Sequence, residues 1–271
     1  MWNNPFRAMG TVTSSGVEIH YEVEGDGPPL ILRTGGGGDL EMWRLAGYTR
    51  GLPGRRLILI DHRGHGKSGR PRDMAQHGID AYVRDVLAVA EDAGEPRFSF
   101  FGYSAGAAIG YRLAAQHPER IVSLVALGAV GPPPPREGDV FEVAARIRRE
   151  GSEGLVQWLR EEEPDVPEWF ADQMRGTDPE MFALCIEAWT PWRGPWAEFA
   201  RVETPTLIVA GQLEEGDRVS AADHARQAAA ILQDGRVAVL PDLGHVMAFA
   251  RADLVLPHVR PFLEEKAAGN G

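Results

Sequence analysis

Short apolar runs alternate with longer amphipathic segments along most of the chain. The amphipathic segments have helical spacing of apolar residues and cover residues 82–93, 107–116, 221–232 and 254–266. Buried strands that alternate with helices are typical of a mostly parallel sheet covered on both faces. The apolar runs have the length of strands, with turn residues between several of them, and they cover residues 30–32, 57–60, 98–101, 121–129, 206–210 and 237–240. Residues 17–24 instead alternate apolar and polar side chains, which predicts a half-exposed strand.

Residues 131–203 break this alternation. The segment opens with Gly131 and four prolines, which form a stiff connector. Helical spacing follows over residues 140–150, 155–163, 168–174 and 180–189. We therefore expect an α/β core made of residues 1–130 and 204–271, with residues 131–203 as a helical insertion. Five of the seven tryptophans lie in this insertion. The pair Trp189 and Trp192 are candidates for an apolar wall over a substrate, although bulky residues also serve simple packing.

Charge and cysteine content limit the partners. The net charge of −11, without a long basic run, argues against nucleic acid and against an anionic membrane surface. Cys185 is the only cysteine, so no disulfide forms within the chain, and we expect it to pack as a small apolar residue. The first residues contain no apolar signal segment, and no run is long enough to span a bilayer. The sequence therefore predicts a cytoplasmic protein and leaves its oligomeric state open.

The segment around Ser104 carries the strongest chemical signal. An apolar strand runs into Gly102-Tyr103-Ser104-Ala105-Gly106, and a helical run follows. A strand that turns sharply into a helix presents one side chain at its apex, here Ser104. Gly102 and Gly106 relieve the crowding behind such a turn, and the free N–H groups of the helix start face any negative charge that forms there.

This Gly-x-Ser-x-Gly turn resembles the nucleophile elbow of the α/β-hydrolase family. The segment 61–69 also resembles that family's Asp-x-Arg-Gly-x-Gly-x-Ser motif. The resemblance extends from about residue 17 to residue 263. It implies an α/β fold with a mostly parallel sheet of about eight strands, helices on both faces, and a small helical cap at residues 131–203. We interpret the 61–69 motif as structural, with Asp61 and Arg63 holding loops.

We expect neither a metal nor an organic cofactor. His62 and His65 lie three positions apart in a glycine-containing loop, and the sequence offers no evident third ligand beside them. The glycines at 35–38 lack the spacing of a dinucleotide-binding loop, and no phosphate-binding Gly-Lys-Ser/Thr sequence occurs.

A serine hydroxyl needs a base, and the base needs an acid to orient it. His245 follows the last strand in a Gly-His pair that matches the family's histidine loop, and we assign it as the base. The acid is expected in the loop after residue 210. Counting forward from Gly211 favours Glu214, whereas counting back from the next helix favours Asp217, and Glu215 comes third. The order Ser, acid, His is the one expected for this fold.

Two backbone N–H groups are expected to hold the oxyanion of an acyl-transfer reaction. One is that of Ala105, directly after Ser104. The resemblance places the other in the loop after residue 32, where the family has His-Gly and this chain has Thr34 before the glycines. Gly36 is the favoured donor, with Gly35 and Gly37 as alternatives. Four consecutive glycines are also expected to be mobile.

The sequence thus predicts a serine hydrolase that cleaves a small carboxylic ester or lactone through an acyl-enzyme. Tyr103, Trp189 and Trp192 are the expected substrate contacts. The same groups suit C–C bond hydrolysis, thioester hydrolysis or cofactor-free perhydrolysis. A ligand-binding receptor on the same scaffold is the alternative from outside enzymology.

Overall fold

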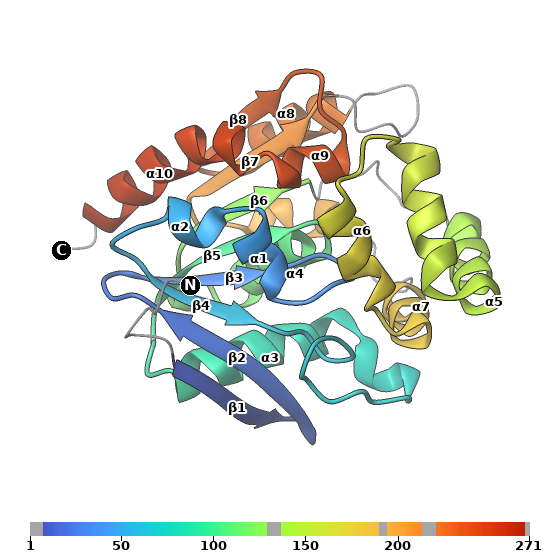
Figure 1. Cartoon of the computed structure of the whole chain (residues 1–271). Helices are drawn as coiled ribbons and strands as arrows, with labels where there is room; N and C mark the ends of the chain where they lie inside the picture. Colours follow the sequence, from blue (N-terminus) through green and yellow to red (C-terminus); the bar gives the residue numbers. More distant parts are fainter. Residues whose placement is uncertain (1–7, 129–136, 190–193, 213–220, 269–271) are drawn as a thin grey trace.

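The computed structural model describes residues 8–128, 137–189, 194–212 and 221–268 (Figure 1). Within these ranges eight strands form one sheet in the order β1-β2-β4-β3-β5-β6-β7-β8. The β1–β2 and β2–β4 pairs are antiparallel, and all pairs from β4 across to β8 are parallel, so the sheet is mostly parallel, as predicted. The strands are β1 (Ala8–Ser14), β2 (Val17–Glu24), β3 (Pro29–Arg33), β4 (Arg56–Ile60), β5 (Phe98–Tyr103), β6 (Ile121–Leu127), β7 (Thr206–Gly211) and β8 (Gly235–Leu240).

The edge strand β1 is the strand that the hydrophobic pattern missed. Its residues are mostly small or polar, and most of its side chains face solvent. It forms because its backbone pairs with β2 over its whole length, from Ala8 with Val23 to Ser14 with Val17. Backbone pairing leaves no apolar signature in the sequence, so the strand is invisible to periodicity.

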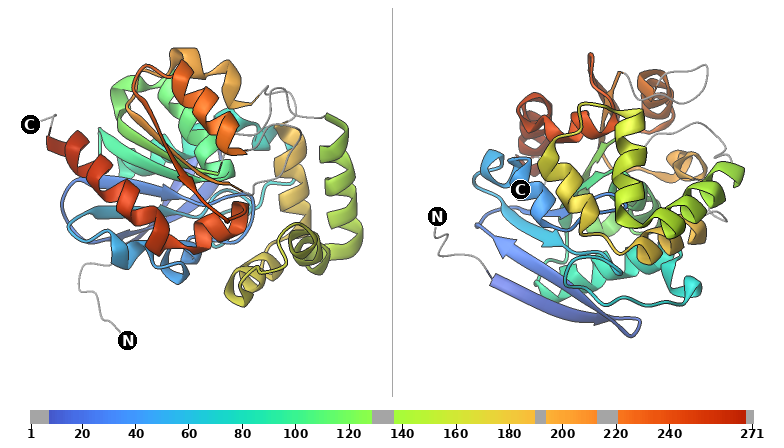
Figure 2. Two further views of the ribbon diagram at one scale, coloured as in Figure 1. Left: turned by 90° about the horizontal axis from the view of Figure 1, so that it is seen from above. Right: turned by 45° about the vertical axis from the view of Figure 1, so that its right-hand side comes forward.

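Helices cover both faces of the sheet, as Figure 2 shows from above. One face carries α3 (Ile79–Asp92), α4 (Ala105–Gln116) and α8 (Ala221–Ile231). The other carries α1 (Glu41–Leu45), α2 (Tyr48–Gly51), α9 (His245–Ala250) and α10 (Ala252–Ala268). Short 3₁₀ turns complete this part of the chain, at Met74–His77, Pro118–Arg120, Pro195–Ala197 and Phe199–Arg201.

Alternate residues of each central strand build two separate hydrophobic cores. In β5, Phe98 and Phe100 pack with α3 and α4, whereas Phe101 and Tyr103 pack with α1 and α9. Both sets are buried, which explains why the central strands read as continuous apolar runs. Because β3, β5 and β8 are parallel, their carboxyl ends lie at the same edge of the sheet, where ligands of such sheets bind.

Three helices between β6 and β7 form a block that we call the cap. They are α5 (Glu137–Glu162), α6 (Glu168–Arg175) and α7 (Pro179–Ala188), and Figure 1 shows them at one end of the sheet. Gly151, with φ of 71°, interrupts α5 between the two helices expected from the sequence. That the cap is an insertion spanning residues 131–203 stays a prediction.

Candidate active site

Ser104 lies at the turn between β5 and α4, in a backbone conformation that side chains rarely adopt. Its φ and ψ are 52° and −117°. The two flanking glycines are required by close backbone contacts. A Cβ on Gly102 would lie 2.3 Å from the carbonyl carbon of Gly106, and a Cβ on Gly106 would lie 2.2 Å from the carbonyl oxygen of Arg33. The crowding therefore fixes Ser104 at the apex of the turn, with Ala105 as the first residue of the helix behind it.

His245 meets Ser104 from the other side of this edge. It is the first residue of α9, which follows β8 after a short turn. Its Nε2 lies 2.9 Å from the Oγ of Ser104, although 141 residues separate the two, and both side chains are half-buried. The two atoms form a hydrogen bond, which is the contact that lets an imidazole take a proton from a hydroxyl.

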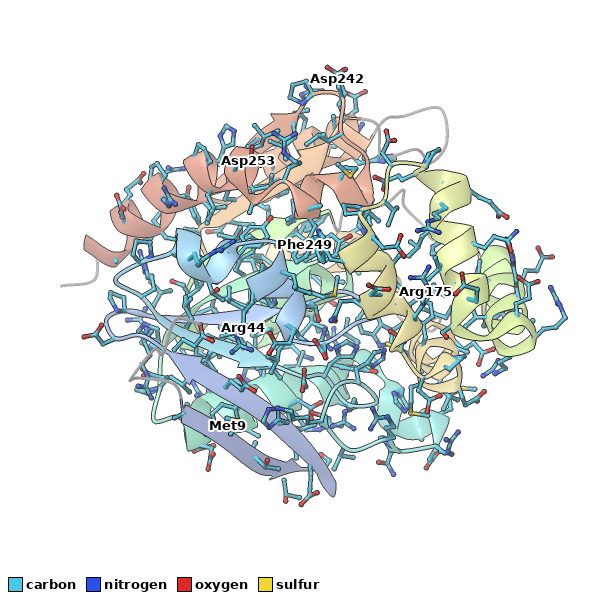
Figure 3. All side chains as sticks on the ribbon, viewed as in Figure 1. Met9, Arg44, Arg175, Asp242, Phe249 and Asp253 are labelled. Atoms are coloured by element: carbon cyan, nitrogen blue, oxygen red, sulfur yellow. The ribbon has the colours of Figure 1, made fainter. Side chains whose placement is uncertain are left out.

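Tyr103 packs behind His245, and its expected contact with the substrate stays a prediction. Its side chain is 3% exposed. The ring stacks on the imidazole of His245 with centroids 5.1 Å apart, and on Phe249 with centroids 4.2 Å apart. Phe249, which Figure 3 labels, belongs to α9, and its ring also packs edge-on against Trp43 of α1. Tyr103 is therefore part of the packing that supports the imidazole.

The glycine loop at residues 35–38 lies between Ser104 and the cap. A Cβ on Gly35 would come within 3.0 Å of the Cβ of Ser104, so the missing side chain lets the loop approach the hydroxyl. On its other side, Gly36 is half-buried and lies against the ring of Phe182 in α7. The loop thus borders the space in front of Ser104, where the predicted oxyanion donors are needed.

Cap side chains anchor the end of this loop, contrary to the mobility expected from four glycines. The N–H of Gly38 donates to Oγ1 of Thr177 at 2.9 Å, and the N–H of Asp39 donates to Oε1 of Gln173 at 3.1 Å. A Cβ on Gly37 would lie 2.7 Å from the sulfur of Met174, so the loop also packs tightly against α6.

Arg33 supports the base of the glycine loop. The family resemblance led us to expect a histidine at the next position, where this chain has Thr34. The guanidinium of Arg33 is buried, donates to the carbonyl oxygen of Thr34 at 2.9 Å and lies 5.1 Å from the ring centre of Tyr82. Burial away from water lowers the pKa of Arg33 to about 10.

The 61–69 motif holds loops, as predicted. The carboxylate of Asp61 accepts N–H groups from Leu40, just after the glycine loop, and from Lys67, each at 2.9 Å. Arg63 forms a buried two-point ion pair with Asp85 and donates to the carbonyl oxygen of Gln76. These bonds connect three loops at the edge of the sheet.

His62 and His65 lie in the same buried region, with ring centroids 3.7 Å apart. Burial lowers the pKa of both imidazoles, that of His65 to about 3. Among the described residues, no group of three or more His, Cys, Asp or Glu side chains is arranged to hold a metal ion.

Several predicted residues cannot be placed. Glu214, Glu215, Asp217 and Trp192 lie outside the described residues. Trp189 directly follows α7, and its indole N–H donates to the carbonyl oxygen of His77 at 2.9 Å. Cys185 is buried and accepts a hydrogen bond from the hydroxyl of Tyr82 at 3.2 Å, and burial raises the pKa of its thiol. It packs in the core, as expected.

Sequence reasoning missed the cap residues that contact the site. Thr177 and Gln173 bind the glycine loop, and Glu163 accepts N–H groups from Val246 and Met247 beside His245. These residues belong to no motif, and their positions depend on how the cap docks, so the sequence offered no signal for them.

The surface hollow at the opposite edge of the sheet is not part of this site. Its volume is about 470 Å³, and it lies at the amino ends of β6 and β7, where Val122 and Pro205 line it. Ser104 and His245 lie at the opposite, carboxyl edge of the sheet. The candidate site is therefore defined by the contact between these two side chains and not by the hollow. No helix in the described part of the chain is long and apolar enough to cross a membrane.

Comparison with known proteins identifies the class. The family model described as the alpha/beta hydrolase fold matches residues 28–164, which is half of the chain. The chain belongs to the α/β-hydrolase family. The fold, the elbow and the histidine loop described above agree with this membership.

Individual relatives point to hydrolysis. A protein of Azorhizobium caulinodans named for carbamate hydrolysis, RutD, is 37% identical over 108 residues, which span 40% of this chain and 39% of that protein. The RutD of Pseudomonas savastanoi pv. phaseolicola is 28% identical over 84% of this chain and 90% of its own length. The crystal structure of the enol-lactonase from Burkholderia xenovorans LB400 has a TM-score of 0.79 and 26% identity, covering 94% of this chain and all of that chain. The first of these relatives is matched over less than half of its own length.

Proposed function

We propose that the protein is a serine hydrolase that cleaves small carboxylic esters or lactones through an acyl-enzyme. The observation that carries the proposal is the 2.9 Å contact between Nε2 of His245 and Oγ of Ser104. A hydroxyl held at the apex of a strained turn, hydrogen-bonded to an imidazole, is the arrangement that activates serine for acyl transfer. The relative solved as an enol-lactonase supports an ester or lactone as the substrate class.

In the first half of the reaction, Oγ of Ser104 attacks the carbonyl carbon while Nε2 of His245 takes the hydroxyl proton. The N–H groups of Ala105 and Gly36 are proposed to hold the tetrahedral oxyanion. The N–H of Ala105 suits this role because the first N–H groups of a helix have no partner within it. His245 then gives its proton to the leaving alcohol, and the acyl-enzyme forms.

In the second half, His245 takes a proton from water, and the hydroxide attacks the acyl carbonyl. The collapse of this intermediate releases the carboxylic acid and returns the proton to Ser104. A carboxylate from the loop after β7, Glu214 or Asp217, is proposed to orient the other imidazole nitrogen. No step in this scheme calls for a metal or an organic cofactor.

The surroundings favour an uncharged, apolar acyl group. Phe182 lies beside Gly36, and Met174 lies beside Gly37, so apolar side chains border the proposed oxyanion loop on the cap side. The net charge of −11 opposes the approach of an anionic substrate. We therefore expect faster hydrolysis of p-nitrophenyl butyrate than of an anionic succinate ester.

The test is hydrolysis of p-nitrophenyl acetate and butyrate by the wild type, Ser104→Ala and His245→Gln. We expect each variant to lower kcat by roughly 10⁴-fold or more. A fluorophosphonate probe should label the wild type at Ser104. Turnover by Ser104→Ala equal to that of the wild type would exclude the mechanism. A wild type that shows no turnover and no labelling, yet binds small ligands, would favour the receptor alternative.

A further inference from the structure

The side chain of Glu163 reaches from the cap to the start of α9. Glu163 directly follows α5 and is half-buried. One carboxylate oxygen accepts the N–H of Val246 at 2.6 Å, and the other accepts the N–H of Met247 at 3.0 Å. These two residues follow His245 in the first turn of α9. Figure 1 shows the connection between α5 and α6 passing beside α9.

This carboxylate replaces a cap that α9 lacks in its own sequence. The first N–H groups of a helix have no partner within it, and a side chain at the preceding residue normally accepts one of them. In α9 that preceding residue is Gly244, which has no side chain. Glu163 satisfies two of these groups at once, and its negative charge is favoured at the positive end of the helix.

Gly244 leaves the space that the carboxylate occupies. A Cβ on Gly244 would lie 2.5 Å from both Cδ and Oε2 of Glu163. The φ of Gly244 is −87°, which any residue can adopt, so its own backbone does not require glycine here. The packing of Glu163 against Gly244 gives a reason for the glycine that precedes His245.

We propose that Glu163 is a positioning residue for His245. By fixing the first turn of α9, it aims Nε2 of His245 at Ser104, and it makes this aim depend on the docking of the cap. The inference rests on the proposed function, because it assumes that His245 acts as the base. It is distinct from the acid of the triad, which we expect in the loop after β7, since the bonds from Glu163 go to backbone N–H groups of α9.

The first experiment compares Glu163→Gln and Glu163→Ala with Glu162→Gln as the matched control. Glu162 is the neighbouring carboxylate, and its side chain is exposed. We expect kcat for p-nitrophenyl butyrate to fall roughly 5- to 50-fold in both Glu163 variants, because a small misplacement of the imidazole slows proton transfer. KM should change less than about threefold, and the control should match the wild type.

A purely structural contact would lower the Tm of the Glu163 variants and leave kcat unchanged, and that result would overturn the proposal. A rise in KM alone would also overturn it, since it would assign Glu163 to substrate binding. Glu163→Gln keeps the shape of the side chain and one acceptor oxygen, so it gives a folded variant even if Glu163→Ala does not.

A second variant approaches the same contact from the other side. Gly244→Ala should push the carboxylate from its place and lower kcat in the same way. In the Glu163→Ala background the Gly244→Ala substitution should have little additional effect, because the contact is already lost. Independent, fully multiplicative losses would contradict the coupling.

A readout besides turnover separates this inference from the proposed function. The side-chain NMR signal of His245, identified by its loss in His245→Gln, should shift or broaden in Glu163→Gln and stay unchanged in Glu162→Gln. If Ser104→Ala turned over ester as fast as the wild type, the proposed function would fail. The NMR comparison would still decide whether Glu163 sets the environment of His245. An unchanged His245 signal in Glu163→Gln would overturn the inference.

Discussion

The hydroxyl oxygen of Thr177 in the cap accepts the N–H of Gly38 at 2.9 Å, across 139 residues of sequence. Thr177 is 6% exposed, and the bond closes the end of the glycine loop that borders Ser104. Together with Glu163, it means that cap side chains contact both the glycine loop and the first turn of α9, the helix that carries His245. The cap therefore takes part in building the site that it borders.

Replacing Thr177 with Val should lower kcat roughly 3- to 30-fold. Valine has nearly the same shape, but it leaves the buried N–H of Gly38 without an acceptor, which costs about 1–3 kcal/mol and loosens the loop. Thr177→Ser keeps the hydroxyl and should retain most of the activity. Steady-state kinetics with p-nitrophenyl butyrate measures both variants. Equal kcat for Thr177→Val and the wild type would show that the glycine loop does not depend on this hydrogen bond.

Removing the acid of the triad should cost far more. We expect Glu214→Ala to lower kcat by roughly 10³- to 10⁴-fold, because an unoriented imidazole seldom presents the correct nitrogen to Ser104. Asp217→Ala and Glu215→Ala serve as matched comparisons within the same loop. If Asp217→Ala carries the large loss, the acid is Asp217, and small losses for all three would exclude this loop as its source.

Substituting Gly102 with Ala should destabilise the elbow. The added Cβ would lie 2.3 Å from backbone atoms of Gly106, which cannot move without displacing α4. We expect the free energy of unfolding to fall by about 2 kcal/mol or more, with loss of activity. Gly78→Ala is the control, since its φ is −61° and no atom lies within 4 Å of the new Cβ. Urea denaturation measures both, and a Gly102→Ala protein as stable as the control would refute the crowding argument.

The buried imidazoles predict a loss of stability in mild acid. The folded pKa values of His62 and His65 lie below 6.5, so below pH 6.5 the unfolded chain takes up protons that the folded chain does not. Their contribution is complete above pH 6.5 and declines as the pH falls, for His65 until about pH 3. At pH 5 the loss amounts to about 2 kcal/mol for His65, and the loss for His62 has the same sign.

Replacing His62 with Phe tests this linkage. The side chain is buried, and neither ring nitrogen has a hydrogen-bond partner within the described residues. Phe cannot take up a proton, so the variant should lose less stability than the wild type between pH 7.5 and pH 5. His258→Asn, at an exposed position, should follow the wild type. Urea denaturation at the two pH values measures the difference, and a parallel decline in His62→Phe would contradict the assignment.

The sequence by itself determined the parts of this protein that depend on local patterns. Continuous apolar runs specified strands buried on both faces, and helical spacing specified the helices between them. The glycines around Ser104 specified the sharp turn because their pattern is contained within five residues, although the backbone that crowds Gly106 is that of the distant Arg33. The Gly-His pair follows the last strand after a short turn, and this local position placed His245 at the correct edge of the sheet.

Tertiary structure alone decided the contacts between segments that are far apart in the chain. The 2.9 Å approach of His245 to Ser104, the bond from Gly38 to Thr177 and the carboxylate of Glu163 at α9 each join residues 83 to 141 positions apart. It also decided that the ring of Tyr103 stacks on the imidazole of His245. Such contacts depend on how the cap and the loops dock on the sheet, and docking depends on the shapes of whole surfaces, which no short sequence pattern encodes.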